Sequence, residues 1–594
     1  MRKPVSAVDA NRLQARPVAR ITAEEVEGQL KKMARGKAAD RKGVVAEMLR
    51  FGGAGLLQVL ADVFNDILVE EQMPPESWKE TRLTVLYKKG DAASLENYRP
   101  VAIIPILYKP FIRILDTRIR ERIAHQQSVD QAAFRPGFTC IDHLFTLTQM
   151  SEKMEEWQLN VWVAAVDFRK AFDTVEHDAI WGALEELGAP SAYTNALRRL
   201  YDGQTARVGG ERESKAFSIN RGTKQGDPVS PTLFNAVLEV VMRRLKTRWG
   251  GKRYGFDLEY GAPRRMQNLR FADDLMLFGK TLPQVATMLA DLSEEAGKVG
   301  LEIHFGKTKI LSTVTDRRGV SATREVAVAG QKVEVLQPGE SVAYLGRCLS
   351  FQNFMDRELE HRITRAWAKF GAFKGELCDK RYCLVHRLKL FNAVVTPTVL
   401  YGSECWTMTA ARAQKLKVAQ RKMLRKMLGT ARKVQARGRP LAVDDGKEAQ
   451  GDGAEDGSSE GETQSEGEAE STASGEESDD KEDKETWVEW MARTARVASH
   501  MMFKAKIPDW VQEQRRRKWR WAGHVVRRRD MRWSTRMVFW EPFRQGSRPV
   551  GRPATRWEDS VVKFAHSRGF NWHQTAEDRD KWKGLEDDFV RFEI

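Results

Sequence analysis

Residues 268–279, NLRFADDLMLFG, contain two short apolar runs that meet at a pair of adjacent acids, Asp273 and Asp274. Apolar runs of this length, interrupted by a polar pair, predict two short strands joined by a tight hairpin. The two acids would then lie at the tip of the hairpin. Adjacent carboxylates framed by buried strands are costly unless a cation neutralises them or their pKa values rise. A divalent metal ion is therefore the expected partner.

A third acid, Asp167, ends the segment VWVAAVD (161–167), a near-continuous apolar run that predicts a buried central strand. Further on, SPTLFNAVLEVVMRRL (230–245) predicts a helix with Ser230 as its cap and Pro231 at its first position. Magnesium prefers carboxylate and phosphate oxygens, so Asp167 would complete a site with the hairpin acids. Taken singly, each acid has a plainer explanation, because aspartates at strand ends commonly cap helices or face water.

The charge of the chain is unevenly distributed. The formal net charge is +16, but residues 444–485 hold 18 Asp or Glu and three Lys, a local charge of −15. The remainder of the chain therefore carries +31. A surplus of that size is typical of a protein that binds the phosphate backbone of nucleic acids, although it says nothing about sequence specificity.

Composition also bounds the organisation of the chain. With 594 residues it should form several domains, since single cores stop growing near roughly 250 to 300 residues. The acidic segment lacks Phe, Trp, Tyr, Ile, Leu, Val and Met, which predicts a disordered linker. A solvated spacer is its simplest role, and competition with nucleic acid for basic surfaces is the alternative. The sequence shows no apolar run of membrane-spanning length, no secretory signal and only five thinly spread cysteines, so we expect an intracellular protein with reduced thiols and no membrane partner.

Seven segments of the first 430 residues stand in a characteristic order. They are NYRPVAII (97–104), QAAFRPGFTCIDHL (131–144), AVDFRKAFDTV (165–175), GTKQGDPVSPTLFN (222–235), FADD (271–274), GLEIHFGKTK (300–309) and YLG (344–346). The series resembles the motifs of the reverse transcriptases of LINE-type non-LTR retrotransposons and, more distantly, those of group II introns. Seven motifs in the family's order make the resemblance specific.

The resemblance implies an α+β fold, the right-hand polymerase, with fingers, a palm of antiparallel sheet and packed helices, and a helical thumb. The expected domains are an N-terminal helical extension (1–75), reverse transcriptase fingers and palm (76–345), thumb and connection (346–440), the acidic disordered linker (441–486), and a small basic Trp-rich C-terminal region (487–594). The implied function is RNA-directed DNA polymerase, which joins deoxynucleotides to a DNA 3′-hydroxyl on an RNA template.

The family's functional residues map onto matching positions of this sequence. Asp167, Asp273 and Asp274 would be the catalytic residues and would hold two Mg²⁺ or Mn²⁺ ions. The residues that would contact the incoming nucleotide are Lys88, Arg99, Phe172, Gln225, Gly226 and Lys307.

These nucleotide contacts have distinct implied roles. The charges of Lys88 and Arg99 suit the triphosphate, and Phe172 would act as a steric gate against a ribose 2′-hydroxyl. Gly226, next to Gln225, permits a close backbone approach to the nucleotide, and Lys307 would serve the departing pyrophosphate. The plainer alternative is that the lysines are solvated and the phenylalanine belongs to the core.

Two departures from the family pattern stand out. The segment GKAADRKGV (36–44) lacks the Pro-Gly of a turn that many relatives share, a change that would loosen the N-terminal extension of the fingers. Asp227 stands where many relatives have Cys, so it would either weaken substrate binding or be harmless. Neither departure removes a catalytic group.

The C-terminal region interleaves arginine with tryptophan, as in RRRKWRWAGHVVRRRDMRW (515–533). This pattern favours phosphate contact combined with stacking on unpaired bases. A tryptophan core with a solvated arginine face is an equally good interpretation. The candidate nucleic-acid-binding residues are Arg515, Arg516, Arg517, Trp519, Trp521, Arg527 and Arg528.

Elements of this family also need an endonuclease that nicks the target DNA, and neither of its known types is evident in this sequence. We therefore expect the polymerase to use an RNA template, a DNA primer or target and dNTPs, with an endonuclease supplied by another domain or chain. The expected location is the nucleus. The alternative function is a catalytically silent nucleic-acid-binding remnant that keeps the fold.

Overall fold

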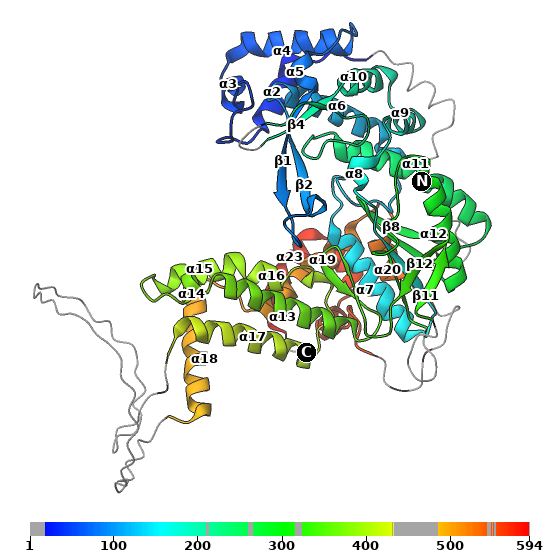
Figure 1. Cartoon of the computed structure of the whole chain (residues 1–594). Helices are drawn as coiled ribbons and strands as arrows, with labels where there is room; N and C mark the ends of the chain where they lie inside the picture. Colours follow the sequence, from blue (N-terminus) through cyan, green and yellow to red (C-terminus); the bar gives the residue numbers. More distant parts are fainter. Residues whose placement is uncertain are drawn as a thin grey trace, which may run out of the picture. The chain divides into compact units, whose positions relative to one another are not determined.

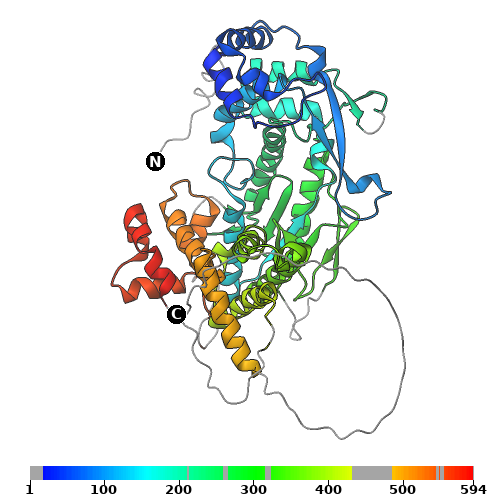
Figure 2. The ribbon, with the colours of Figure 1, turned by 90° about the vertical axis from the view of Figure 1, so that its left-hand side faces the viewer.

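The computed structural model describes residues 18–209, 213–258, 265–314, 323–430, 432, 485–542, 548, 551 and 554–592 (Figures 1 and 2). The predicted disordered linker, 441–486, lies outside the described residues except for its last two positions. Two compact units make up the chain. The first comprises Met1–Arg362, Leu400–Ala413 and Gln512–Ile594, and the second comprises Ile363–Val399 and Gln414–Val511. These units differ from the predicted domains, because most of the C-terminal region belongs to the same unit as the palm.

A six-stranded sheet of order β11-β12-β10-β3-β9-β8 forms the centre of the first unit. Its strands are β3 (Trp162–Val166), β8 (Asn268–Phe271), β9 (Asp274–Gly279), β10 (Lys309–Ser312), β11 (Glu325–Val328) and β12 (Gln331–Val335). All neighbours pair antiparallel except β10 and β12, which are parallel. The structure confirms the predicted α+β fold with a largely antiparallel palm sheet.

Six helices accompany this sheet in the palm. They are α7 (Cys140–Glu156), α8 (Ala171–Thr174), α9 (His177–Glu186), α10 (Ser191–Tyr201), α11 (Ser230–Gly251) and α12 (Leu282–Gly297). Helix α12 lies against β3, β9 and β11, beside the sheet in Figure 1. One detail differs from prediction: Ser230 is inside α11 and Val229 is the cap residue, because the Ser230 hydroxyl donates to the carbonyl of Lys224 at 2.7 Å instead of capping the helix.

Both faces of the central strands are buried, as the apolar sequence of β3 requires. Ala164 and Leu277 pair across β3 and β9 and lie in the core cluster that also contains the apolar side chains of α11 and α12. Val163 and Phe278 form the neighbouring pair, and alternation along a strand directs them to the opposite face. They are fully buried as well. The strand that ends in Asp167 is therefore held firmly on both sides.

A smaller sheet of order β2-β1-β4-β5 and the N-terminal helices form the fingers. These strands are β1 (Glu80–Tyr87), β2 (Tyr98–Ile103), β4 (Thr205–Val208) and β5 (Phe217–Ser218); the helices are α2 (Ala23–Lys31), α3 (Ala46–Arg50), α4 (Gly53–Leu68), α5 (Glu76–Lys79) and α6 (Tyr108–Ile123), with short turns η1 (Leu95–Asn97) and η2 (Ala124–Gln126). The turn at 36–44 is tied down without the family's Pro-Gly, since the Asp40 carboxylate accepts hydrogen bonds from the backbone of Lys42, Val44 and Ile106 at 2.9 to 3.0 Å.

The remaining elements of the first unit include two small hairpins and the C-terminal helices. The hairpins are β6 (Phe256–Asp257) with β7 (Arg265–Met266) and β13 (Val342–Tyr344) with β14 (Arg347–Leu349), and η3 (Ser403–Cys405) is a single turn. The C-terminal helices are α19 (Trp510–Arg527), α20 (Trp533–Phe539), α21 (Asp559–Ser567), α22 (Trp572–Glu577), α23 (Arg579–Gly584) and α24 (Glu586–Arg591). Helix α20 runs beside α7 (Figure 1).

Helices dominate the second unit. It contains α14 (Lys374–Cys378), α15 (Leu384–Val394), α16 (Thr396–Val399), α18 (Trp487–Lys504) and most of α13 (Phe354–Ala372) and α17 (Ala410–Leu428). Trp510 stacks on Phe391 with ring centroids 5.7 Å apart, and its indole N–H donates to Thr396 Oγ1 at 3.0 Å. No helix in the described ranges is both long and apolar enough to cross a membrane. All five cysteines are free.

Candidate active site

The two adjacent acids lie where the predicted hairpin turns. Phe271, the last residue of β8, pairs with Asp274, the first residue of β9, so the turn consists of Ala272 and Asp273. Ala272 adopts a left-handed backbone with φ of 57°, which is uncommon for a residue with a side chain. Its N–H donates to Gln131 Oε1 at 3.0 Å. A residue outside the hairpin therefore restrains the backbone that carries both acids.

The register of β3 and β9 brings Asp167 beside the hairpin. Val166, the last residue of β3, pairs with Leu275, so Asp167, the residue after β3, lies at the end of the sheet where β9 begins with Asp274. The backbone N–H of Asp167 donates to Thr308 Oγ1 at 3.3 Å. The structure thus places all three predicted catalytic acids at the same end of neighbouring antiparallel strands.

The three carboxylates perturb one another electrostatically. Loss of solvation raises the pKa of Asp274 to about 6, and the negative charges of Asp273 and Asp167 contribute to the rise. Loss of solvation also raises the pKa of Asp273, with a further contribution from Asp167. A divalent cation would relieve this mutual repulsion, and carboxylate oxygens are the ligands that Mg²⁺ and Mn²⁺ favour. The chemistry of the three acids therefore fits the expected metal ions.

The side chains are spread more widely than a metal site requires. Across the described part of the chain, no group of three or more His, Cys, Asp and Glu side chains lies close enough to hold one ion. Asp274 keeps an exposed surface, although the protein atoms crowded around its carboxylate reduce its solvation, whereas Asp167 and Asp273 are partly buried. The predicted metal ligation by these three residues stays a prediction.

Two basic residues of the fingers act on the same acids. Lys88 follows the last residue of β1, and Arg99 in β2 pairs with Leu86 of β1, so both belong to one hairpin. Both side chains are exposed. Loss of solvation raises the pKa of Asp273, and the positive charges of Lys88 and Arg99 partly offset that rise. The residues predicted to hold the triphosphate therefore lie within electrostatic reach of a predicted catalytic acid.

Lys307 approaches the first catalytic acid. Its Nζ lies 4.0 Å from Asp167 Oδ2, and its side chain is 67% exposed. A cation at this position stays available to an anionic leaving group, but nothing in the structure tests that role.

A ring contact and hydrogen bonds join the predicted steric gate, Phe172, to α11 and to the loop before it. Phe172 is partly buried, and its ring stacks on Phe234 of α11 with centroids 4.4 Å apart and planes at 24°. The N–H of Thr223 donates to the carbonyl of Phe172 at 2.6 Å. Gln225 Nε2 donates to Asp173 Oδ1 at 3.0 Å. The ring of Phe172 is therefore held in a fixed orientation beside the loop that carries Gln225.

Gly226 has a structural reason to be glycine. Its φ is 110°, and a Cβ there would lie 2.9 Å from the carbonyl oxygen of Ala102 in β2. The N–H of Ala102 in turn donates to the carbonyl of Gln225 at 2.7 Å. Contact between this loop and the fingers thus requires the glycine, and its predicted approach to a nucleotide remains to be tested.

Asp227, the departure from the family pattern, faces the protein interior. Its Oδ2 accepts a hydrogen bond from the Tyr108 hydroxyl at 2.6 Å. Burial raises the pKa of Asp227, and the nearby Lys224 opposes the rise. Burial lowers the pKa of Lys224 to about 8, and its Nζ lies 5.8 Å from the centre of the Tyr108 ring. The negative charge of Asp227 therefore offsets the positive charge of the buried Lys224.

The sequence analysis did not assign a role to two residues that the structure connects to the site. Gln131 supports the catalytic turn through Ala272, and Asp173 accepts the amide of Gln225. Gln131 lies in the family segment 131–144 and Asp173 in the segment 165–175. Their position within these motifs was the only sequence feature that pointed to a role in the site.

The structure contradicts base stacking by two predicted tryptophans. Trp519 is fully buried and stacks on Trp582 with centroids 3.6 Å apart and planes at 1°. Trp521 is 7% exposed and packs edge-on to Phe145 of α7 at 5.7 Å. Indoles enclosed in this way present no face to a nucleic-acid base. Both tryptophans belong to the core, because Trp582 packs on Trp519 and Phe145 of the palm packs on Trp521.

The other five members of the predicted nucleic-acid-binding set are arginines that contact protein groups. They pair as follows: Arg515 with the carbonyl of Phe589, Arg516 with Glu513 and Glu586, Arg517 with Glu513 and the carbonyl of Leu400, Arg527 with the carbonyl of Ala576, and Arg528 with Asp142. Arg528 is buried in its ion pair, which contradicts its predicted role. For the other four arginines, nucleic-acid contact stays a prediction.

Part of the chain is similar to known proteins. Residues 87–348 match the family model of the reverse transcriptase (RNA-dependent DNA polymerase). A putative uncharacterized transposon-derived protein of Caenorhabditis elegans is 28% identical over 328 residues, which are 54% of this chain and 94% of that protein. The retrovirus-related Pol polyprotein from the type-1 retrotransposable element R2 of Popillia japonica is 29% identical over 345 residues, 57% of this chain and 46% of that protein.

Among solved structures, telomerase from Candida albicans in complex with a fragment of telomeric RNA aligns over 64% of this chain and 67% of that one, with 10% identity and a TM-score of 0.36. The matched region spans less than half of the R2 polyprotein. The motif order, the palm geometry and the family match agree. Residues 87–348 of this chain are therefore similar to the reverse transcriptase domains of non-LTR retrotransposons.

Proposed function

We propose that this chain is an active RNA-directed DNA polymerase that adds deoxynucleotides to a DNA 3′-hydroxyl on an RNA template. The observation that carries the proposal is the strand register that pairs Val166 with Leu275, because it brings Asp167 to the end of the sheet where the hairpin presents Asp273 and Asp274. Three acids in this arrangement, next to two basic residues of the fingers, form a site for an anionic substrate and cations.

Asp167, Asp273 and Asp274 would hold two divalent ions, Mg²⁺ or Mn²⁺. When bound, such ions supply activation of the primer 3′-hydroxyl and neutralisation of the leaving pyrophosphate. The raised pKa of Asp274, about 6, and of Asp273 supports this assignment, because cations favour the ionised carboxylates. Their carboxylate oxygens would hold the ions together with oxygens of the substrate phosphates.

The surrounding residues bind and orient the nucleotide. Arg99 and Lys88 would contact triphosphate oxygens, and Lys307 near Asp167 would stabilise the departing pyrophosphate. Phe172 would exclude a 2′-hydroxyl, because its ring is packed against Phe234 and cannot easily turn aside.

The remaining assignments follow from the polymerase proposal. Gln225 and Gly226 would lie along the nucleotide, with Gln225 held by Asp173. The substrates are dNTPs, an RNA template and a DNA primer or target, and an endonuclease in another domain or chain would nick the target. The site of action would be the nucleus.

A primer-extension assay with the full chain tests the proposal. An oligo(dT) primer on poly(rA) with dTTP and Mg²⁺, or Mn²⁺ in parallel, should be extended. Asp167→Asn and Asp273→Asn should each reduce the rate about 100-fold or more, which corresponds to about 3 kcal/mol of barrier. Asp202→Asn, at an exposed position away from the hairpin, is the matched control and should extend normally.

Two results would overturn the polymerase assignment. Undiminished extension by Asp273→Asn would show that the activity comes from another site. A folded, unmutated chain that binds the primed template but adds no nucleotide would favour a catalytically silent nucleic-acid-binding remnant.

A further inference from the structure

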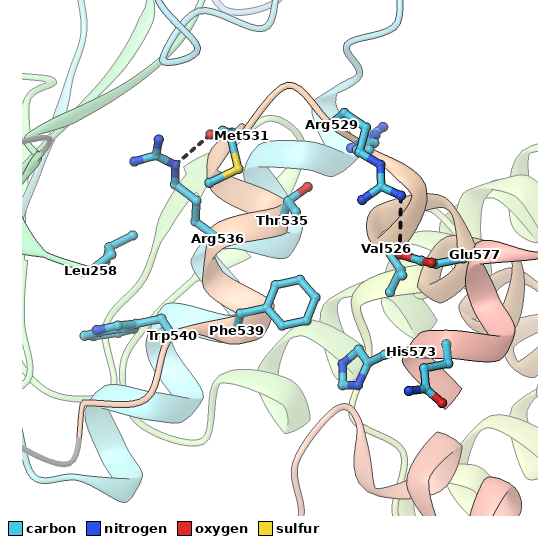
Figure 3. A pocket seen from close by; sticks show the side chains of 12 residues that line it. Leu258, Val526, Arg529, Met531, Thr535, Arg536, Phe539, Trp540, His573 and Glu577 are labelled. Carbon is cyan, nitrogen blue, oxygen red and sulfur yellow. Dashed lines mark hydrogen bonds and ion pairs between the residues drawn. The ribbon is translucent and has the colours of Figure 1, made fainter. Parts of the chain in front are cut away.

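A cavity in the C-terminal region has no role in the polymerase proposal. It measures about 430 Å³ and lies between the loop after α19, helix α20 and helix α22, as Figure 3 shows. Its volume is within the range of about 300 to 1,000 Å³ that small-molecule sites occupy. The residues that matter for its chemistry are Arg529, Arg536, Phe539, His573, Gln574 and Glu577.

Two aromatic rings flank the cavity. Phe539, the last residue of α20, is 54% exposed, and its ring lies 5.1 Å from the imidazole of His573 with planes at 37°. His573 therefore packs against the Phe539 ring at the edge of the cavity (Figure 3). His573 in turn rests on Trp572, 3.8 Å away. A single exposed phenylalanine would need no explanation, but here a second ring stands beside it, supported from behind.

The cavity also contains an unused hydrogen-bonding group. Nε2 of His573 is buried, and among the described residues it has no hydrogen-bond partner. Burial lowers the pKa of His573, so at neutral pH the ring is uncharged and its Nε2 can donate or accept a single hydrogen bond, depending on the tautomer. An unpaired buried nitrogen of this kind is costly unless a ligand or a water completes it. The exposed amide of Gln574 is beside it on the same helix.

Cationic side chains stand at the rim. The Arg529 side chain is 79% exposed, and it forms an ion pair with Glu577 at 3.3 Å. Arg536 Nε donates to the carbonyl of Met531 at 2.7 Å. Figure 3 shows the two guanidinium groups on either side of Met531. Glu577 is the one acid that lines the cavity, and its exposed pair with Arg529 is weak enough for a phosphate to displace.

We propose that this cavity binds one unpaired nucleotide of a single-stranded nucleic acid, with the base stacked on the open face of the exposed Phe539 ring and the flanking phosphates at Arg529 and Arg536. This inference rests on the proposed function, which requires single-stranded template. Aromatic rings stack on any base, a neighbouring polar group contacts the base edge, and arginines contact the backbone. Duplex is excluded, because its bases are stacked inside the helix and cannot enter a cavity. The site would hold template or displaced strand outside the palm, and it replaces Trp519 and Trp521 as the stacking surface of this region.

Photo-crosslinking of the full chain tests the proposal. The probes are single strands of about 20 nucleotides, longer than a typical binding site, with 4-thiouridine in RNA or 4-thiothymidine in DNA at one position. We expect a crosslink in the peptide that contains Phe539 or the one that contains His573. Comparison of the RNA and DNA probes shows which strand the site takes, and a duplex probe should give no crosslink there.

Variants with matched controls measure the contribution of the cavity to binding. Phe539→Ala should weaken binding about 5-fold or more, the effect of losing one base stack. Phe51→Ala removes another exposed phenylalanine, which precedes α4, and this variant should bind as the unmutated chain does. Arg529→Gln should also weaken binding, whereas Arg568→Gln, which breaks another exposed 3.3 Å ion pair of the same region, should not. Thermal melting of each variant verifies that it is folded.

The outcomes separate this inference from the polymerase proposal. Crosslinks confined to other peptides, or equal binding by Phe539→Ala and Phe51→Ala, would overturn the nucleotide site even if primer extension succeeds. A crosslink in the cavity by a chain that extends no primer would sustain the nucleotide site and reject the polymerase. A synthetic peptide that competes for the cavity while neither probe crosslinks there would identify a protein-docking site and overturn the proposal as well.

Discussion

The indole N–H of Trp533 donates a hydrogen bond of 2.7 Å to the carboxylate of Asp130, a residue 403 positions earlier in the chain. The backbone carbonyl of Asp130 accepts from Arg270 of β8 at 2.8 Å. Burial would raise the pKa of Asp130, but the charges of Lys246 and Arg270 and the indole hydrogen bond hold it at about 2. The C-terminal region is thus bonded to the segment that supports the catalytic hairpin.

Removing this hydrogen bond should lower both stability and polymerase activity. Trp533→Phe keeps an aromatic ring but leaves Asp130 without its indole donor. Hydrogen bonds to charged groups contribute about 1.5 to 3 kcal/mol, so the free energy of unfolding should fall by about that amount. Urea denaturation measures the loss, and primer extension by the folded variant should be slower because the hairpin is less well supported.

Trp582→Phe is the matched control for Trp533→Phe. Its indole N–H donates to the carbonyl of Trp519 at 2.9 Å, entirely within the C-terminal region. This variant should lose stability but, while folded, extend primers at the normal rate. Equal slowing in both variants would reject a specific connection between Trp533 and the hairpin.

Gln131 should act as a positioning residue for the catalytic turn. Its Oε1 accepts from the backbone N–H of both Ala133 and Ala272, at 3.0 Å each. Gln131→Met keeps the size of the side chain but leaves two buried donors unpaired, so we expect kcat to fall about 10-fold with KM for dTTP nearly unchanged. Gln131→Glu retains the acceptor oxygens and should recover part of the rate. A change confined to KM would instead indicate a direct role in nucleotide binding.

Phe172 should set the selectivity between deoxynucleotides and ribonucleotides. Its ring stacks on Phe234 and cannot move aside without losing that contact. Phe172→Val opens space for a 2′-hydroxyl, and the ratio of kcat/KM for dTTP over UTP should fall about 10- to 100-fold. Phe305→Val, at another partly buried position packed on the same core, should preserve the ratio. Unaltered selectivity in Phe172→Val would place the gate elsewhere.

The elements whose sequence pattern is local were predictable. The short apolar runs on either side of Asp273 and Asp274 predict a hairpin, and the apolar run before Asp167 predicts a buried strand, because burial on both faces needs no information from elsewhere. The register that brings Asp167 to the same end of the sheet as Asp273 and Asp274 is a long-range property. It was foreseen only through the family resemblance.

The C-terminal region shows why the rest could not be predicted. Arginine alternating with tryptophan fits both an exposed stacking surface and a buried core, and the sequence offers no local rule to choose between them. The choice is made by Trp582 and by Phe145 of α7, which enclose Trp519 and Trp521 respectively. These partners are remote in sequence. Composition therefore indicated a basic, tryptophan-rich region, but it could not show which of its side chains face the core.

Lys518 should make the free energy of unfolding depend on pH in the alkaline range. It is buried in α19, and burial lowers its pKa to about 8 although Glu152 and Asp559 oppose the shift. The unfolded chain therefore binds more protons between about pH 8 and 10.5, so the free energy of unfolding should rise over that range. Lys518→Met should reduce the rise, measured by urea denaturation at several pH values. Lys583→Met, at an exposed position of the same region, should leave the pH profile unaltered; a profile for Lys518→Met that equals the unmutated one would contradict the assignment.

The contacts between the C-terminal region and α7 should hold the protein together after the backbone is cut. Trp557 packs on Phe145 at 4.7 Å, and Arg532 pairs with Asp142 at 3.2 Å. A protease site placed within residues 441–484 allows cleavage of the purified chain. We expect the two fragments to elute together from a size-exclusion column, also at high salt, because the aromatic contact is not screened as a surface ion pair is.

The cleaved chain should also keep its primer-extension activity, since the connection between Trp533 and Asp130 does not depend on the linker. Phe145→Ala removes the aromatic partner of both Trp521 and Trp557, at a cost of about 3 to 5 kcal/mol, and should let the cleaved fragments separate. Phe51→Ala, at an exposed position, should not. If the unmutated fragments separated on cleavage alone, the linker would be holding the C-terminal region in place, and the packing on α7 would be too weak to support the palm.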